Sequence, residues 1–118
     1  MAEPTKMRGC PVEVTLKVFG GKWKPLIVYY LLDGTRRFGE LRRLLPHATQ
    51  QMLTLQLREL EQVGVLHRQV YAQVPPKVEY SLTELGRSLE PILRQMNAWG
   101  EWYCQQSGIS LEKLIAET

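Results

Sequence analysis

Hydrophobic residues in the first 45 positions recur at the spacing of helices rather than of strands. Residues 10–20 and 25–34 each carry a proline at the start and a glycine at the end, as helices often do. The second of these segments is almost entirely apolar, so we expect it to be buried on most sides. Residues 38–45 place apolar side chains on one face only, and Pro46 then ends the segment. Three helices are therefore predicted before residue 49.

A fourth helix is predicted over residues 49–64, with Thr49 as its N-cap and Gly64 as its end. A narrow stripe of leucines would pack this helix on a core; its members are Leu53, Leu57 and Leu60. The first residues of this helix and the face opposite the leucines carry residue types found in contacts with DNA. They are Thr49, Gln50, Gln51, Thr54, Leu55 and Arg58. We interpret Gln50, Gln51, Thr54 and Arg58 as base-reading, and we count Thr49 and Leu55 as further DNA-binding residues. An ordinary solvated helix face is the alternative.

Two stretches of alternating apolar and polar residues follow and predict a β-hairpin. They cover residues 66–70 and 78–82, and the loop between them contains two prolines that restrict its conformations. Two cations of this hairpin, Arg68 and Lys77, are candidates for contacts with phosphates or with the minor groove. The order helix, turn, helix, hairpin predicts a winged helix-turn-helix, a mainly α fold with a small β-hairpin (α+β). An ordinary surface hairpin is the alternative.

The last third of the chain carries a long apolar stripe that suggests a dimerisation helix. Thr83 is the expected N-cap, and Pro91 is expected to kink or split the helix because it removes a backbone donor. Apolar residues recur at alternating spacings of four and three, and those assigned to a dimer interface are Leu89, Ile92, Met96, Trp99 and Tyr103. We predict a homodimer whose interface is formed by the helices of residues 10–20 and 83–118. Packing onto the chain's own core is the alternative.

Composition and charge fit one domain over residues 1–118. The chain is 44% apolar and 23% charged, which suits a single core behind a flexible tail of residues 1–9. Residues 1–82 carry twelve lysines and arginines against seven acidic residues, whereas residues 83–118 carry three against five. The basic front is therefore expected to face a polyanion, double-stranded operator DNA. The side chains expected to contact its phosphates are Arg36, Arg37, Arg42, Arg43, Arg68 and Lys77.

No signal sequence, membrane-spanning segment or catalytic constellation is recognisable in the chain. This predicts a cytoplasmic protein with no membrane partner that is not an enzyme. His47, His67 and the two cysteines lie far apart in the sequence, so neither a metal site nor a cofactor is expected. The alternative to a DNA-binding regulator is a winged-helix adaptor that binds protein or RNA.

Five sequence blocks resemble the HxlR family of bacterial winged helix-turn-helix transcription regulators, whose fold is related to that of MarR regulators. The blocks are GGKW, RRF-x-ELRR, ML-T-x-QLRELE, VPP-x-VEYSLTELG and W-G, and the resemblance spans residues 10–104. It implies a homodimer, a repressor by default, with residues 49–64 in the major groove of a palindromic operator and residues 71–77 as the wing. Leu55 departs from the polar residue that relatives often carry.

Cys10 is the candidate regulatory residue, although the sequence does not identify an inducer. The resemblance implies sensing of oxidants or electrophiles, because some members of the family respond to them through a cysteine at the matching position. From the residues alone, Cys10 is expected at the N-cap of the helix that Pro11 opens, where free backbone donors favour a thiolate. A small apolar filler is the alternative. Cys104 is expected to pack, or to approach the partner's Cys10 in a dimer.

Overall fold

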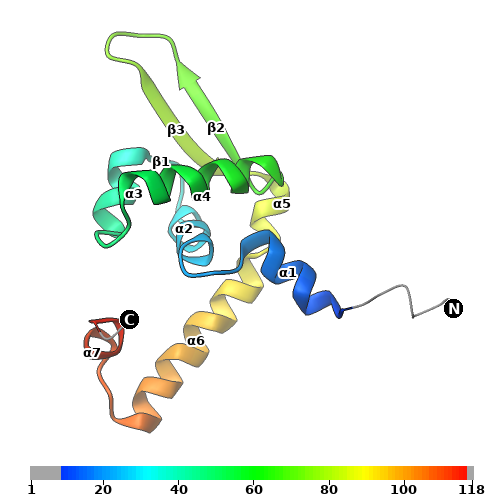
Figure 1. Cartoon of the computed structure of the whole chain (residues 1–118), viewed down its shortest axis with the longest axis vertical. Helices are drawn as coiled ribbons and strands as arrows, with labels where there is room; N and C mark the ends of the chain where they lie inside the picture. The colour runs from blue at the N-terminus through cyan, green and yellow to red at the C-terminus, as the bar shows by residue number, and fades with distance from the viewer. Residues whose placement is uncertain (1–8, 117–118) are drawn as a thin grey trace, which may run out of the picture. The chain divides into compact units, whose positions relative to one another are not determined.

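The structure is a computed structural model that describes residues 9–116, with side chains described as far as residue 113. Residues 1–8 of the expected tail lie outside this range. The elements are α1 (Pro11–Phe19), α2 (Lys24–Leu31), β1 (Arg36–Arg37), α3 (Phe38–Leu44), α4 (Gln50–Gln62), β2 (Leu66–Tyr71), β3 (Lys77–Leu82), α5 (Glu84–Arg87), α6 (Glu90–Ser107) and α7 (Leu111–Ala116) (Figure 1). The chain divides into two compact units, an N-terminal unit of residues 1–88 and a C-terminal unit of residues 89–118.

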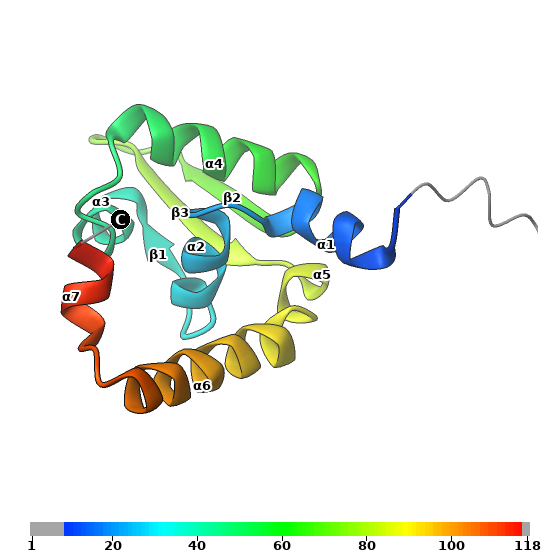
Figure 2. The same cartoon turned by 60° about the horizontal axis from the view of Figure 1, so that its bottom comes forward.

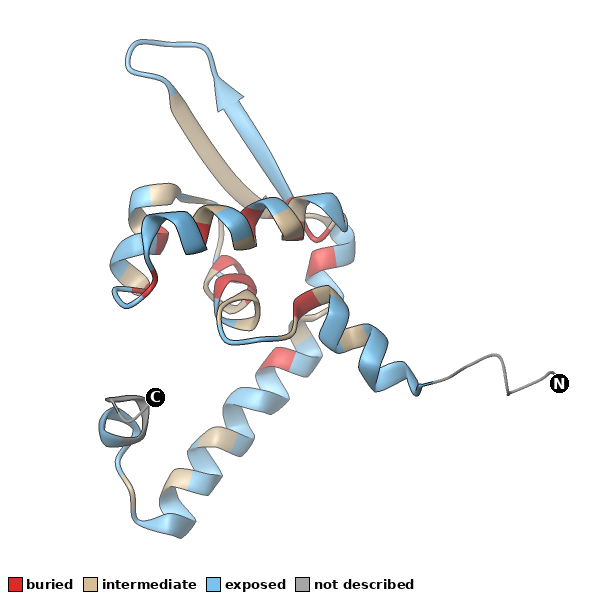
Figure 3. Ribbon diagram, viewed as in Figure 1, coloured by how far each residue is buried: buried red, intermediate tan, exposed pale blue. Residues whose placement is uncertain are grey.

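The core of the N-terminal unit is built from the apolar faces of its helices. As Figure 3 shows, buried positions follow one face of α4 and part of α2, whereas β2 and the hairpin loop are largely exposed and β3 is mostly intermediate. The fully buried side chains are Ile27, Val28, Leu31, Leu41, Leu53, Leu57, Leu60, Val65 and Leu66. The predicted leucine stripe of α4 is therefore confirmed. The helix α2 is buried along one face and not on most sides, since Leu26 is exposed. Burial of apolar area is what holds α4 in place.

A three-stranded antiparallel sheet, in the order β1-β3-β2, lies beside α2 and α4 (Figure 2). The hairpin is in register from Leu66 opposite Leu82 to Tyr71 opposite Lys77. The sequence predicted only the hairpin, and β1 is an addition. It contains two arginines, with Arg36 opposite Tyr80. A two-residue strand of polar side chains has no alternating pattern, so the local sequence does not predict it.

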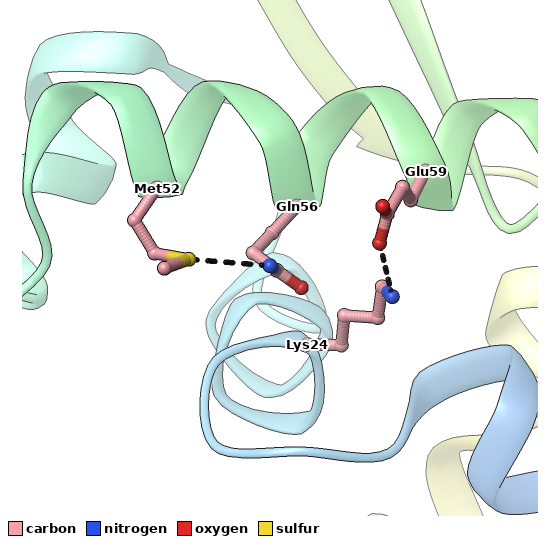
Figure 4. Close-up of polar contacts among 4 residues, drawn as sticks. All are labelled: Lys24, Met52, Gln56 and Glu59. Atoms are coloured by element: carbon pink, nitrogen blue, oxygen red, sulfur yellow. Dashed lines mark hydrogen bonds and ion pairs between the residues drawn. The ribbon is translucent and has the colours of Figure 1, made fainter.

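Polar contacts join α4 to α2 at the edge of the core (Figure 4). The Lys24 Nζ lies 2.5 Å from the Glu59 Oε1, and both side chains are partly shielded from solvent. On the same side of α4, the Gln56 Nε2 donates to the Met52 Sδ at 3.4 Å. The contact between Lys24 and Glu59 links α4 to α2 without using the face that the sequence assigns to base reading.

Both ends of α4 have the predicted caps. The Thr49 Oγ1 accepts a hydrogen bond from the Met52 N–H at 3.1 Å, which satisfies one of the free donors of the first turn. The chain leaves the helix through Gly64, whose φ of +83° is a conformation that favours glycine. The length and direction of α4 are therefore fixed by local chemistry.

Thr83 caps α5 and also joins it to the end of α4. Its Oγ1 accepts from the Gly86 N–H at 3.0 Å and lies 2.5 Å from the Gly64 carbonyl oxygen, to which the hydroxyl donates. The predicted single helix is split here, because α5 ends at Arg87 and Pro91 stands in the first turn of α6. A proline is tolerated there because the first turn has no intrahelical N–H bond to lose.

Thr83→Ala is expected to lower the free energy of unfolding by about 0.5–2 kcal/mol, the usual cost of losing a helix N-cap. The reason is that the hydroxyl serves two partners in partly buried surroundings. Urea denaturation followed by circular dichroism measures the effect. Thr83→Ser keeps the hydroxyl and should stay close to the wild type, and equal midpoints for the alanine variant and the wild type would contradict the capping role.

Candidate nucleic-acid interface

The outward face of α4 has the exposure that the sequence predicted. Gln50, Gln51, Leu55 and Arg58 are exposed, and Thr54 is half-buried. Because the leucine stripe is on the opposite side, these side chains point away from the core. The geometry leaves polar and methyl groups free to meet another surface. Their assignment to base reading stays a prediction.

The four arginines before α4 fall into two groups. Arg42 and Arg43, at the end of α3, are exposed. Arg36 is partly buried, and its Nε donates to the Tyr30 carbonyl oxygen at 2.8 Å. Arg37 is exposed and precedes α3, where its N–H donates to the Glu40 Oε1 at 2.7 Å. The side chains of Arg37, Arg42 and Arg43 are therefore exposed, while Arg36 supports the sheet against α2.

The hairpin loop is shorter than the sequence predicted, and Lys77 lies outside it. Residues 72–76 contain no basic side chain, and Val74 is 99% exposed. Lys77 is the first residue of β3 rather than part of the loop. Arg68 lies further down the hairpin, opposite Tyr80. Loop bounds depend on how far the two strands pair, and the sequence alone does not fix that.

Arg68 and Lys77 lie on opposite faces of the hairpin, since residues directly opposite each other share a face and successive residues alternate. On its face, Lys77 lies 3.7 Å from Glu79 and 4.5 Å from the centre of the Tyr71 ring. The negative charge of Glu79, together with a hydrogen bond to it, raises the pKa of Tyr71 above its usual value. Lys77 therefore already has a carboxylate partner in the free protein.

A cleft of about 190 Å³ separates the outward face of α4 from the sheet. Its lining residues are Thr54, Leu57, Arg58, Glu61, Arg68 and Tyr80. The Arg68 Nε lies 3.3 Å from the Glu61 Oε1. Both side chains are more than a third exposed, so this ion pair contributes only about 0.2–1 kcal/mol.

Tyr80 lines this cleft, and three charged side chains affect the pKa of its hydroxyl. Burial raises the pKa of Tyr80, Glu61 raises it further, and Arg68 and Arg58 lower it, with a net rise. The phenol therefore stays protonated at neutral pH and can donate a hydrogen bond. Glu61 and Tyr80 are not among the site residues predicted from the sequence. Only the strand register, which places Tyr80 opposite Arg68, brings them into one site.

Cys10 is exposed and stands at the N-cap of α1, as predicted. Its carbonyl oxygen accepts from the Glu13 N–H at 2.8 Å, and its thiol makes no capping hydrogen bond. A packed filler residue would be covered, so the interpretation of Cys10 as a small apolar filler does not fit. The thiol is accessible to a reagent in solution.

In the C-terminal unit, the predicted interface stripe lies along one exposed face of α6. Ile92, Met96, Trp99 and Tyr103 are each at least 41% exposed, and Leu89 is half-buried. The Trp99 and Tyr103 rings stack with their centres 5.3 Å apart. An open apolar groove follows the same face, lined by Pro91, Ile92, Gln95, Met96 and Trp99. Large aromatic side chains exposed together are typical of an interaction surface.

Among residues 9–116, no three histidine, cysteine, aspartate or glutamate side chains gather as metal ligands would. No described helix combines the length and the apolar character that crossing a bilayer requires. Two exposed surfaces stand out among the described residues: one polar, on α4 and the hairpin, and one apolar, on α6.

Comparison with known proteins identifies close relatives. The model of the HxlR-like helix-turn-helix family matches residues 18–108. The chain is 65% identical to YdeP, an uncharacterised HTH-type transcriptional regulator of Bacillus subtilis (strain 168), over 95 residues that cover 80% of this chain and 74% of YdeP. A structure of the redox regulator HypR in its oxidised form is 66% identical with a TM-score of 0.76, covering 78% of this chain and 95% of HypR. The reduced form of the transcriptional regulator YodB from B. subtilis is 38% identical with a TM-score of 0.70, covering 83% of this chain and 97% of YodB. These matches confirm the predicted winged helix-turn-helix fold.

Proposed function

The chain belongs to the HxlR-like helix-turn-helix family of DNA-binding transcription regulators, which are not enzymes, and we propose that it is a homodimeric, redox-responsive repressor. The observation that carries this proposal is the outward face of α4. It is polar and exposed, it is held rigidly by a fully buried leucine stripe, and it lies beside a hairpin. In helix-turn-helix proteins the second helix enters the major groove in this way.

In this proposal α4 is the recognition helix and its first two turns read bases. Gln50 and Gln51 have amide groups that pair bidentately with adenine, and the methyl groups of Thr54 and Leu55 can contact thymine. Thr49 lies at the helix N-cap, where its N–H group can approach a phosphate. Phosphate contacts come from the exposed Arg37, Arg42 and Arg43, with Arg68 and Lys77 on the wing.

The exposed stripe of α6 supports a homodimer, with α1 contributing to the interface. Burying Met96, Trp99 and their neighbours against a second copy would remove a large apolar area from water. A two-fold dimer presents two recognition helices about 34 Å apart, which is one turn of DNA. The operator is therefore expected to be a palindrome with half-sites one turn apart. A single domain over residues 1–118, rather than two independent domains, is part of the same proposal.

Redox control through Cys10 is supported by the exposed thiol at the start of α1. An exposed thiol can be reached by the oxidants and electrophiles that modify cysteines. HypR, at 66% identity, is a redox regulator. A covalent change at the start of α1 would alter a helix that we assign to the dimer interface, and with it the spacing of the recognition helices.

A mobility-shift titration against DNA from the protein's own promoter region tests the regulator proposal. We expect tight, salt-sensitive binding to one palindromic segment, and much weaker binding to a scrambled duplex of the same length. Indifference to every duplex sequence, with binding to single-stranded RNA or to a protein instead, would contradict the proposal and favour an adaptor.

Gln51→Ala is expected to relax the base preference at one position in each half-site. A good bidentate pair discriminates against the wrong base by about 1–3 kcal/mol, which is roughly 5- to 150-fold in affinity. Titrations with a set of singly substituted operators measure this. Gln62→Ala, at the far end of the same helix and also exposed, serves as the matched control and should leave every preference unchanged. A uniform loss for Gln51→Ala on all sequences would show that Gln51 does not read a base.

A further inference from the structure

The cleft between α4 and the sheet holds two arginines and one carboxylate. We propose that this cleft is a binding site for one backbone phosphate of bound DNA, and that the Glu61 carboxylate occupies this phosphate site in the free protein. The inference rests on the proposed DNA binding and deepens it. It moves Arg58 from base reading to phosphate binding, and it gives Glu61 a role in setting the affinity for DNA.

The contact of Arg68 with Glu61 supports this assignment. A guanidinium recognises carboxylate and phosphate groups with the same planar set of donors, so the geometry that suits one suits the other. The Arg68 Nε is 3.3 Å from the Glu61 Oε1, and both groups are open to solvent. A phosphate that enters the cleft can therefore replace the carboxylate without uncovering a buried charge.

The position of Arg58 on α4 points the same way. Recognition helices contact base edges chiefly with their N-terminal residues, and Arg58 stands in the third turn of a helix that begins at Gln50. Its side chain lines the cleft together with Arg68. Both arginines also act electrostatically on the Tyr80 hydroxyl. Two guanidinium groups therefore converge on one small volume.

Tyr80 adds an uncharged hydrogen-bond donor to the phosphate site. The phenol is protonated at neutral pH, and burial raises its pKa further, so the hydroxyl can donate to a phosphate oxygen. Lys77 is not part of the phosphate site, because it lies on the other face of the hairpin and pairs with Glu79. The two wing cations therefore act at different places on the DNA.

Glu61→Gln is the first test, and Glu59→Gln is its matched control. Both variants remove one negative charge and one ion pair from α4, but Glu59 faces Lys24 of α2 instead of the cleft. Affinities are measured for the operator and for a scrambled duplex. We expect Glu61→Gln to bind both DNAs about 1.4- to 5-fold more tightly than Glu59→Gln, the factor that corresponds to the ion pair no longer broken on binding.

Arg58→Ala is the second test, and it separates phosphate binding from base reading. If Arg58 holds a phosphate, affinity falls by the same factor for the operator and the scrambled duplex. The loss of affinity between 50 and 200 mM salt also becomes smaller, by up to about 3.5-fold for one phosphate contact. A loss confined to the operator, with unchanged salt dependence, would overturn the assignment. Circular dichroism checks that each variant is folded.

The outcomes separate this inference from the proposed function. If the wild type binds no duplex DNA, the proposed function and the phosphate site are both contradicted. If the wild type binds DNA with strong salt dependence while Glu61→Gln and Glu59→Gln have equal affinities, only the phosphate site is contradicted. If Glu61→Gln does not fold, the salt dependence of Arg58→Ala decides the question.

Discussion

Trp99→Glu is expected to dissociate the proposed dimer and to weaken binding to a two-half-site operator by at least about 100-fold. The side chain is 61% exposed on α6 and stacks on Tyr103 at the centre of the apolar stripe. A carboxylate there would have to be buried without a partner, twice in each symmetric dimer, and this is costly. A monomer engages one half-site at a time and loses the gain from two linked contacts, which is about 10²- to 10⁴-fold.

Sedimentation velocity measures the oligomeric state, and a mobility shift on the same samples measures DNA affinity. Asn97→Glu is the matched control, since it adds the same charge at an exposed position on the other side of α6, about 200° around the helix. It should remain a dimer with full affinity. If Trp99→Glu also remained a dimer, α6 would not form the interface, and the alternative of packing within the chain would regain support.

The helices were predictable from the sequence because their signals are local. Thr49 and Gly64 mark the ends of α4 through side-chain capping and a positive φ, and both act within one turn of the helix. Pro91 separates α5 from α6 for an equally local reason. The buried and exposed faces of α4 follow from its period alone, so the candidate base-reading residues were also predictable.

The cleft was not predictable, because it depends on strand pairing between distant residues. Arg68 and Lys77 look equivalent in the sequence, as two cations of one hairpin. The register places Arg68 opposite Tyr80, and Lys77 three residues from Tyr80 along the same strand, so the two cations face opposite ways. Glu61 is only seven residues from Arg68 and contacts it from the end of α4. The side of the hairpin on which each cation lies is decided by strand pairing between distant residues, which neither composition nor periodicity contains.

Oxidation by diamide is expected to lower the operator affinity of the wild type by about 5- to 150-fold, the usual range of coupling between two sites, and to leave Cys10→Ser unaffected. Diamide converts thiols to disulfides, and the exposed Cys10 thiol at the start of α1 is accessible to it. A disulfide at this position would displace α1, and with it the dimer geometry that sets the spacing of the two recognition helices.

The measurement is a mobility-shift titration before diamide, after diamide and after reduction with dithiothreitol, with mass spectrometry to identify the oxidised residue. Cys104→Ser is the informative companion variant, because Cys104 is half-buried on α6. If it responds to diamide as the wild type does, the disulfide does not involve Cys104. If both single variants are insensitive, the two cysteines act together. Full affinity of a wild-type sample in which Cys10 is demonstrably oxidised would remove the sensor role, because the thiol would then react without any consequence for DNA binding.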